Sequence, residues 1–515
     1  MTMPDKDIYD VAIVGYGPVG ATFANLLAKY GLRILVVEQA AAPYDKPRAI
    51  TIDHEVLRVF QACGLEDTIA KHTVPHPGTH YLGVDKTVIK AFDPMPPPYP
   101  LGWTPTATFV QPEFETALRR KFAAYENADV FLSTPAIDVT QDSAGVSLTV
   151  NGTNGECVFR ARYLVGCDGA NSFVRKKLDI AFDDLAFDEW WMVVDALDHH
   201  ATDRPQKCFQ YCWPSRPGTF LPGPGALRRW EIKILPGEDP ATFGQPDNVT
   251  KVLAAFTDPS KLEIWRSAVY RFHALLAQSW QSDRILLMGD AVHQTPPFLG
   301  QGLSAGIRDA VNLAWKLALV LRDDAAPSAL ETYAEERKPH VSKIVATAKE
   351  FGLIIGELDP VNAEARDKRL HAELQSGQAQ TNRQRFIPDL TGGLIAKGTP
   401  AAGTLFPQPD IETLSGKVRL DNLLTPEFLI AAASPIALKA LTPESLAIWN
   451  RLRGQLVAIK ETGTLFSDWL DRYDITAAIV RPDRTVFGGA RTPDELNALI
   501  ANLARQLKPA VAAKP

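Results

Sequence analysis

The sequence predicts an α/β fold in which a doubly wound parallel sheet is combined with an inserted β-sheet and a C-terminal domain. Three observations predict it. A strand, a glycine-rich turn, a helix and a second strand follow one another within residues 9–37. Two further apolar strands, at 161–165 and 284–288, each lead into a turn and a helix. The stretches between and after these units contain short strand patterns with many Pro and Gly, which indicates additional sheets.

Size, charge and cysteine content limit the functions that this chain can have. Its 515 residues, 46% hydrophobic and 22% charged, are enough for two or three globular domains. The net charge of −6 is spread without basic stripes, which disfavours nucleic acid or a membrane surface as partner. The five cysteines lack zinc or disulfide spacing, and neither a signal peptide nor a membrane-spanning run is recognised. We therefore expect a cytoplasmic protein with a small-molecule partner and no metal.

The first motif is a glycine-rich turn between a strand and a helix. A β-branched strand over residues 9–14 is followed by Gly15-Tyr-Gly-Pro-Val-Gly20 and an apolar helix. Gly15 permits the sharp bend, Gly17 lets the backbone approach a pyrophosphate, and Gly20 lets the helix pack against the strand. The residues expected around the anion at this helix start are Gly15, Gly17, Pro18, Val19 and Gly20.

An acidic residue follows the next strand. The strand over residues 33–37 ends in Glu38, which is followed by Gln39. At about 20 residues beyond the turn, a carboxylate accepts hydrogen bonds from the adenosine ribose and disfavours a 2′-phosphate. This combination predicts an adenine dinucleotide, and FAD and NAD both remain open on this motif alone. Gly223-Pro-Gly225 lacks a third glycine and a following helix, so we expect no second nucleotide-binding domain.

The second motif lies in the middle of the chain. Residues 161–165 form an apolar strand, Asp168 and Gly169 form a turn, and Ser172 is placed to cap the next helix. By itself an Asp-Gly turn is common as a plain connection between a strand and a helix. The motif therefore predicts a cofactor contact only in combination with the other two.

The third motif combines a carboxylate with a helix start. Asp290 follows an apolar strand over residues 284–288 and can accept hydrogen bonds from the ribityl hydroxyls of a flavin. Gly300 and Gly302 then open a long helix from about Leu303. The positive end of this helix dipole would stabilise the negative charge of a reduced flavin.

These three motifs, in this order, resemble the single-component FAD-dependent aromatic hydroxylases, the class A flavoprotein monooxygenases. The likeness covers the chain to about residue 321. It is closest to the 3-(3-hydroxyphenyl)propionate hydroxylase branch through Pro47-Arg-Ala-Ile-Thr-Ile-Asp53 and Gly306-Ile-Arg-Asp-Ala-Val-Asn-Leu-Ala-Trp-Lys-Leu317. The resemblance implies FAD as cofactor and NADH or NADPH as transient co-substrate. It also implies that oxygen from O2 passes through a flavin C4a-hydroperoxide to a phenolic or aromatic-carboxylate substrate.

The resemblance assigns roles to individual residues. It implies that Arg48 and Gln111 contact the flavin, that Asp290 holds the ribityl chain, and that Asp168-Gly169 serves both FAD and the transient nicotinamide. For Arg48 and Gln111 a surface cation and a helix start are the alternatives. The expected cofactor-binding residues are Gly15, Gly17, Pro18, Val19, Gly20, Glu38, Gln39, Arg48, Gln111, Asp168, Gly169, Gly289, Asp290, Pro297, Gly300, Gly302 and Leu303.

Catalysis requires a group that takes the substrate's phenolic proton, because a phenolate reacts faster than a phenol. An arginine pair on the inserted sheet can bind a substrate carboxylate, with a surface salt bridge as the alternative. A structural role is the preferred interpretation of His54 and of His293. The candidate catalytic residues are Pro297 at the oxygen site, His54, Tyr211 and Arg229, with Arg228 and Trp230 beside the last.

The resemblance also predicts the domain organisation. The fold is a Rossmann-like FAD-binding domain with an inserted β-sheet substrate domain, as in para-hydroxybenzoate hydroxylase, and a C-terminal part that looks like a thioredoxin-like domain. No cysteine follows Cys212, so the C-terminal domain is expected to have a structural or dimerising role, with a homodimer as an open alternative. The predicted ranges are 1–75, 105–185 and 280–350 for the FAD-binding domain, 76–104 and 186–279 for the substrate domain, 351–400 for a helical linker, and 401–515 for the C-terminal domain.

Two alternative functions remain on the same sequence. One keeps the flavin and changes the reaction to a decarboxylating hydroxylation or a halogenation, although no Trp-x-Trp-x-Ile signature is present for the latter. The other is a non-catalytic binding protein of the GDP-dissociation-inhibitor type. The exact substrate, the ring position, the choice of NADH or NADPH and the oligomeric state are not specified by these motifs.

Overall fold

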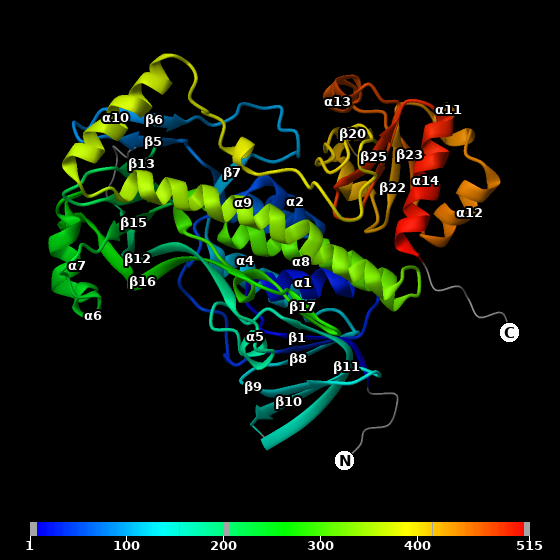
Figure 1. Ribbon diagram of the computed structural model, residues 1–515, viewed down its shortest axis with the longest axis horizontal. Coiled ribbons are helices and arrows are strands. Elements are labelled where there is room, and N and C mark those ends of the chain that lie inside the picture. Colours follow the sequence, from blue (N-terminus) through cyan, green and yellow to red (C-terminus); the bar gives the residue numbers. More distant parts are fainter. Residues whose placement is uncertain (1–7, 154, 200–206, 415, 509–515) are drawn as a thin grey trace.

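The structure is a computed structural model that describes residues 8–153, 155–199, 207–414 and 416–508. Two eight-stranded sheets and two long helices form the larger part of the molecule, and a four-stranded sheet with its helices forms a separate C-terminal unit (Figure 1). The predicted mixed α/β fold with several sheets is therefore confirmed.

The first sheet is a parallel core with an antiparallel extension. Its path is β17-β18-β11-β1-β2-β8, and β18, β11, β1, β2 and β8 pair in parallel. The apolar runs recognised in the sequence form its central strands, because a parallel strand covered on both faces needs apolar side chains throughout. The strands are β1 Tyr9–Val14, β2 Ile34–Val37, β8 Ala128–Phe131, β9 Ala136–Gln141, β10 Val146–Gly152, β11 Gly155–Gly166, β17 Gln281–Ser282 and β18 Ile285–Leu287.

Several helices and a small sheet surround this parallel core. α1 packs against both α4 and α8, and α2 also packs against α8. The small sheet has the order β3-β7-β4 and carries the chain between the two large sheets. These elements are α1 Pro18–Ala28, β3 Thr51–Asp53, α2 His54–Ala62, α3 Glu66–His72, β4 Thr73–Pro75, β7 Thr106–Phe109, α4 Gln111–Phe122 and α5 Phe173–Lys177.

The second sheet has the order β19-β16-β12-β15-β14-β13-β5-β6. One face carries an apolar cluster that includes Trp230 and is covered by Phe243 and Leu253 from two short helices. The other face turns toward the first sheet and carries polar residues. Its strands and covering helices are β5 Thr79–Leu82, β6 Val88–Phe92, β12 Phe182–Leu197, β13 Cys208–Tyr211, β14 Gly218–Pro222, β15 Leu227–Lys233, α6 Pro240–Phe243, α7 Pro246–Leu253, β16 Glu263–Ala277 and β19 His293–Gln294.

Two long helices run side by side across the molecule, α8 (Gly302–Leu321) and α9 (Glu331–Gly356) (Figure 1). Most of α8 is buried, because apolar residues make up most of its sequence and its charged residues Arg308, Asp309 and Lys316 form ion pairs with neighbouring elements. Beyond α9 the predicted helical linker is helical only in part. After α10 (Pro360–Gln375) the chain makes one 3-10 turn, η6 (Arg383–Phe386), and is otherwise irregular, since prolines and glycines interrupt any longer helix.

The C-terminal unit has a mixed sheet of order β23-β22-β24-β25. Its last helix begins as the capping pattern predicts, because the Thr492 hydroxyl accepts a hydrogen bond of 3.2 Å from the Glu495 N–H. The predicted apolar face of this helix is buried. The elements are β20 Asp410–Thr413, β21 Gly416–Arg419, β22 Leu429–Ala432, α11 Pro435–Lys439, α12 Pro443–Arg451, β23 Gln455–Ala458, α13 Leu465–Tyr473, β24 Ala477–Val480, β25 Val486–Ala490 and α14 Pro493–Leu507.

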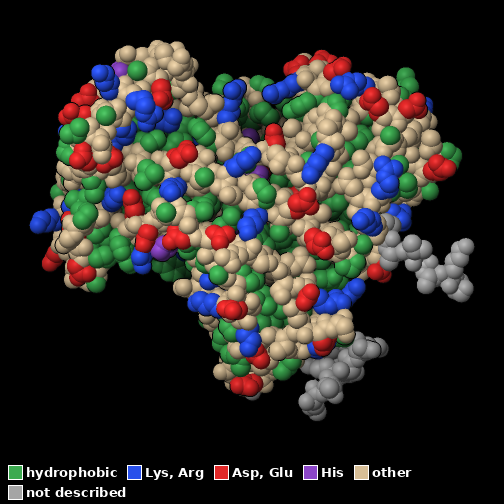
Figure 2. All heavy atoms as spheres, in the orientation of Figure 1, with side chains coloured by type: hydrophobic (Ala, Val, Ile, Leu, Met, Phe, Trp, Pro, Cys, Tyr) green, Lys and Arg blue, Asp and Glu red, His purple; other side chains and the backbone are tan. Residues whose placement is uncertain are grey.

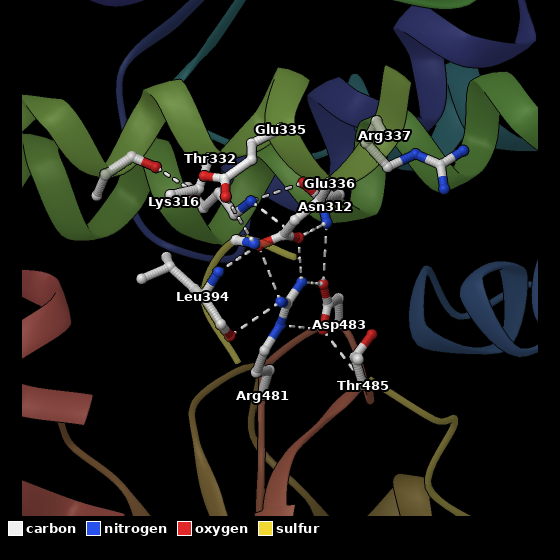
Figure 3. Close-up of polar contacts among 12 residues, drawn as sticks. Asn312, Lys316, Thr332, Glu335, Glu336, Arg337, Leu394, Arg481, Asp483 and Thr485 are labelled. Atoms are coloured by element: carbon white, nitrogen blue, oxygen red, sulfur yellow. Dashed lines mark hydrogen bonds and ion pairs between the residues drawn. The ribbon is translucent and has the colours of Figure 1, made fainter. Parts of the chain in front are cut away.

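A buried ionic cluster joins this unit to the long helices (Figure 3). Arg481, from the end of β24, donates to Glu336 of α9 at 2.8 Å and also pairs with Asp483. Lys316 of α8 lies 3.0 Å from the same Glu336 carboxylate, to which Asn312 donates at 2.6 Å. The side chains of Arg481, Glu336 and Lys316 are all 0% exposed. The charges of the two cations are therefore compensated by those of Glu336 and Asp483, because water cannot solvate them.

The charge distribution, the apolarity of the helices and the grouping of His, Cys, Asp and Glu can be followed over the described residues. Figure 2 shows acidic and basic side chains interspersed on the face in view. Among the described helices none is both long and apolar enough to cross a membrane. The same residues contain no group of three or more His, Cys, Asp and Glu that could hold a metal ion.

Candidate active site

A cavity of about 930 Å³ lies between the two large sheets. Residues of the first sheet, the start of α8 and the polar face of the second sheet all line it. Gly20, the exception among the expected cofactor-binding residues, is buried between α1 and the turn. The others line this one cavity: Gly15, Gly17, Pro18, Val19, Glu38, Gln39, Arg48, Gln111, Asp168, Gly169, Gly289, Asp290, Pro297, Gly300, Gly302 and Leu303.

The glycine turn has the close packing that its sequence indicates. A Cβ atom on Gly20 would lie 2.1 Å from the Gly15 carbonyl oxygen, so only glycine fits there. Gly15 has φ +99°, a left-handed conformation that favours glycine. A Cβ on Gly17, in contrast, would meet no atom within 4 Å, because this residue faces the cavity. The first N–H groups of α1 are thus open to an anion.

The Glu38 carboxylate lines the cavity beside the glycine turn. It accepts hydrogen bonds from the Tyr16 N–H at 2.7 Å and the Ala40 N–H at 2.8 Å, which hold it at the edge of the glycine turn. Each carboxylate oxygen can accept a further hydrogen bond. The residue is therefore oriented to receive hydroxyl groups from a ligand in the cavity.

The Asp168 carboxyl is held by one oxygen and leaves the other without a partner. Its Oδ2 accepts from the Val174 N–H at 3.0 Å, while Oδ1 is buried and has no hydrogen bond to a described residue. Burial raises the pKa of Asp168. The predicted cap is also present, since Ser172 accepts from the Arg175 N–H at 2.9 Å.

Asp290 and the start of α8 form another part of the cavity wall. Burial raises the pKa of Asp290, which His293 and Arg48 lower in part. Gly300 has φ +59°, and a Cβ there would lie 2.3 Å from the Thr51 hydroxyl. Gly302 is the first residue of α8, and a Cβ on it would meet nothing within 4 Å, so the helix N-terminus opens directly onto the cavity.

The loop that carries Arg48 is fastened to α4. The Gln111 side-chain oxygen accepts hydrogen bonds from the backbone N–H groups of Arg48 at 3.1 Å and Ala49 at 2.7 Å. Arg48 itself is exposed and lines the cavity. His293, in contrast, has the expected structural role: its side chain is fully buried and pairs with Asp309 at 2.7 Å.

Two of the candidate catalytic residues lie outside the cavity wall. Tyr211 points to the opposite face of the second sheet, where its ring packs 4.7 Å from Trp213 and 5.0 Å from Phe256 between centroids. Successive strand residues face opposite sides, so Gln210 is the residue of β13 that lines the cavity at this level. His54 also lies outside the wall, and burial lowers its pKa, which keeps the imidazole neutral.

The arginine pair is occupied by the protein itself. Arg229 lines the cavity, but its guanidinium binds Asp195 at 2.7 and 2.9 Å and the backbone carbonyls of Pro47 and Arg48. It ties the second sheet to the Arg48 loop. Arg228 points to the other face and donates to carbonyl oxygens of the turn before β15. Because both guanidinium groups bind oxygens of the protein, the arrangement does not place the two arginines together around a substrate carboxylate.

Glu231 was not among the sequence candidates, although it is two residues beyond Arg229 on the same face of β15. It lines the cavity, is 7% exposed, and makes no hydrogen bond to a described residue. The Arg229 guanidinium is 4.0 Å away and already bound to Asp195. Burial raises the pKa of Glu231 to about 7. Its signal in the sequence was the alternation of polar residues along the strand.

These features fit FAD. N–H groups are free at the starts of α1 and α8, and the Asp168 Oδ1 and Thr295 Oγ1 atoms at the cavity are buried without a partner among the described residues. Glu38 and Asp290 both line the cavity, so hydroxyl groups along an extended ligand would meet carboxylates. Cβ atoms on Gly17 and Gly302 would face the space that such a ligand needs.

Comparisons with known proteins agree with this fit. The sequence model described as "FAD binding domain" matches residues 8–348, and that described as "HcaD C-terminal domain" matches 403–506. A 3-(3-hydroxy-phenyl)propionate/3-hydroxycinnamic acid hydroxylase of Comamonas testosteroni is 30% identical over 98% of this chain and 97% of that protein. A probable NADH-specific resorcinol 4-hydroxylase of Rhodococcus jostii (strain RHA1) is 33% identical over 98% of this chain and 96% of that protein.

Solved structures share the fold. The flavin-dependent monooxygenase PieE, in complex with FAD and substrate, has a TM-score of 0.83 at 20% identity and covers 98% of this chain and 100% of its own. Aklavinone-11 hydroxylase with FAD and aklavinone has a TM-score of 0.78 at 21% identity, with 98% and 100% covered.

The fold and the cavity define the class of FAD-dependent monooxygenases that hydroxylate aromatic compounds, with NAD(P)H as electron donor. The resemblance stated from the sequence motifs is confirmed by the near full-length relatives. The chain belongs to the FAD binding domain family.

Proposed function

We propose that this protein hydroxylates the ring of a small phenol with O2 and NADH or NADPH. One observation carries the proposal: a single cavity joins the dinucleotide turn, the start of α8 and the polar face of the second sheet. The two relatives named above are hydroxylases of phenols, and the fold is shared with flavin monooxygenases. A substrate on the polar face would therefore lie next to the reactive part of the cofactor.

Bound FAD would supply the electron transfer and the oxygen activation of this reaction. We propose that the glycine turn holds the pyrophosphate, that Glu38 binds the ribose, and that Asp290 binds the ribityl chain. The N-terminus of α8 would stabilise negative charge on the reduced ring system, because its dipole is already oriented and water need not reorganise. Pro297, Arg48 and Gln111 would complete the wall around the ring and exclude water.

The test of the function uses the purified protein loaded with FAD. We expect a phenol to accelerate NADH or NADPH oxidation and a product that contains one oxygen atom from ¹⁸O2. The same protein without phenol is the control for uncoupled oxidation. If a broad set of phenols, phenolic acids included, gives no oxygen-labelled product, the proposed reaction is wrong.

We propose that Glu231 accepts the phenolic proton. Its carboxylate lines the cavity without a hydrogen bond to described residues, and the pKa of about 7 suits an acceptor that works near neutral pH. Tyr211 and His54 lie outside the cavity wall, so neither competes for this role.

Replacing Glu231 by glutamine tests this role through the pH dependence. Wild-type kcat/KM is expected to fall below about pH 7, because the carboxyl, whose pKa is about 7, is then protonated. Glu231→Gln should lower kcat at pH 8 by roughly 100-fold or more and remove this acid limb.

The control is Glu238→Gln, which changes an acid that pairs with Arg216 and lies outside the cavity wall. Because the folded pKa of Glu231 exceeds its ordinary value of 4.5, its ionisation costs stability as the pH rises from 4.5 to 7. The glutamine variant should therefore be at least as stable as wild type at pH 8. An unchanged acid limb in Glu231→Gln would contradict the role.

We also propose three properties that the sequence predicts: the division into domains, a cytoplasmic location, and a thioredoxin-like C-terminal domain. The division into domains is supported because residues 76–104 and 186–279 contribute strands to the second sheet. The four-stranded sheet lies within the range 401–515. A mixed sheet with helices around it supports a thioredoxin-like origin of the C-terminal domain. The cysteines lack disulfide spacing, which supports a location in the reducing cytoplasm. Whether the protein forms a homodimer can be measured by light scattering.

A further inference from the structure

Arg383 is an arginine of the cavity wall that makes no ion pair with a described acid. Arg383 begins the 3-10 turn η6 in the irregular chain after α10, and its side chain lines the cavity beside Gly300. Its Nη2 donates to the Leu299 carbonyl oxygen, and no other hydrogen bond links it to the described chain. Within the described ranges no carboxylate lies within 4.0 Å of this guanidinium. Part of its N–H fork is therefore available to a ligand.

Three buried arginines differ from Arg383 in this respect, whereas Arg48, which also lines the cavity without an ion pair to a described acid, is exposed. Arg229 binds Asp195 at 2.7 Å, and Arg481 binds Glu336 at 2.8 Å. Arg308 pairs with Glu55 at 2.7 Å. Burial lowers the pKa of Arg383, which means that the protein disfavours its charge. A desolvated cation without an acid costs stability, and an anionic ligand would offset that cost.

The Asp53 carboxylate near Arg383 is bound to Arg308 and makes no ion pair with Arg383, and the His76 and Cys208 side chains near Arg383 are uncharged. Burial, with the charges of Arg383 and Lys207, lowers the pKa of His76 to about 3, so its imidazole is neutral. The His76 Nε2 lies 3.0 Å from the Cys208 Sγ. Burial raises the pKa of Cys208 to about 12, so the thiol is also uncharged. An anion that pairs directly with Arg383 would therefore come from a molecule in the cavity.

The position of Arg383 relates it to the proposed reacting end. The Arg383 guanidinium lowers the pKa of Cys208 while the Glu231 carboxylate raises it, so both groups lie near this thiol. The two charged groups make no ion pair with each other. A substrate can thus place its hydroxyl at Glu231 and a second, anionic group at Arg383.

We propose that Arg383 binds a carboxylate on the substrate, so that the preferred substrate is a phenol with an acidic side chain. The proposal rests on the proposed function and names its substrate class. A carboxylate matches the planar guanidinium fork and forms charge-assisted hydrogen bonds with it. Arg383, from the predicted linker, takes the place of the arginine pair expected on the second sheet.

The test measures binding to the FAD-loaded enzyme by the change in flavin absorbance. The ligands are 3-(3-hydroxyphenyl)propionate, its neutral amide and resorcinol. Wild type is expected to bind the acid more tightly than the amide. Arg383→Met should weaken the acid by roughly 100-fold, the loss of one or two charge-assisted hydrogen bonds, and change the two neutral ligands by less than about 3-fold.

Two variants serve as controls. Arg271→Met removes another arginine of the cavity wall, one that already pairs with Asp188, and should leave the ratio of acid to amide affinity unchanged. Arg383→Lys keeps the charge without the fork and should give an intermediate loss. If Arg383→Met fails to retain flavin, the ratio of acid to amide affinity in Arg383→Lys tests the proposal instead.

Equal weakening of acid and amide in both Arg383 variants would overturn the proposal, and so would a wild-type enzyme that does not prefer the acid. Binding is measured without turnover, so the outcome does not depend on the reaction. Hydroxylation of resorcinol without an Arg383-dependent preference for acids would overturn this inference alone. Acid binding through Arg383 without any oxygenated product would overturn the proposed function alone.

Discussion

Replacing Gly20 by alanine is expected to weaken FAD binding by roughly 100-fold, as overpacking strain of about 3 kcal/mol would cause. The added Cβ would lie 2.1 Å from the Gly15 carbonyl oxygen. That oxygen belongs to backbone that cannot easily move, because the Gly15 N–H donates to the Val37 carbonyl at 2.9 Å. Helix α1 would have to shift away from β1, and its N–H groups would no longer face the pyrophosphate.

The measurement is the flavin content of the purified variant and its FAD affinity by fluorescence quenching. Gly17→Ala separates packing from ligand contact, because a Cβ there meets no protein atom within 4 Å. We expect Gly17→Ala to leave the thermal stability of the FAD-free protein unchanged and to weaken FAD, whereas Gly20→Ala lowers both. A Gly20→Ala protein with full flavin content would refute the close-packing argument.

Replacing Arg481 by alanine is expected to lower the free energy of unfolding by about 3–5 kcal/mol. Arg481 is fully buried between Glu336 and Asp483, and its removal leaves two buried acids with Lys316 as their nearby cation (Figure 3). In the wild-type protein the Arg481 guanidinium and the Lys316 ammonium lower the pKa of Glu336 to about 2. Without Arg481 the attachment of the C-terminal unit to α8 and α9 would weaken.

Urea denaturation of the FAD-loaded protein measures this effect. Arg491→Ala is the matched control, because its ion pair with Asp474 is solvent-exposed and should contribute less than about 1 kcal/mol. In the double variant Arg481→Leu/Glu336→Leu, we expect the loss to be smaller than the sum of the single losses. A loss below about 1 kcal/mol in Arg481→Ala would show that the cluster does not stabilise the fold.

The parts of the site that follow a strand could be predicted from the sequence. Gly15, Asp168 and Asp290 each come within a few residues of an apolar strand, and parallel strands bring such residues to one edge of the sheet. Their mutual position therefore required no knowledge of distant contacts. The same holds for the cap of the last helix at Thr492, which depends on residues within one turn.

The face of a strand could not be predicted in the same way. Tyr211 and Gln210 are neighbours in the chain, and a shift of one residue in the pairing exchanges the side that each faces. In the structure Gln210 pairs with Thr219 in β14, which places Gln210 in the cavity and Tyr211 in the apolar cluster. Tyr211 therefore lies away from the cavity that the prediction required it to line. Glu231 shares the cavity face with Arg229, and its burial there became evident only from the packed sheet.

By itself, the sequence determined the class of the protein and its cofactor, because the motifs that bind a dinucleotide are short and their geometry is set by local backbone conformation. Only the tertiary structure decided the substrate end. Glu231 and Arg383 come from a sheet and from an irregular segment far apart in the chain, and both line one cavity. Their chemistry depends on burial and on which charges remain unpaired, and these arise only when the separate segments pack together.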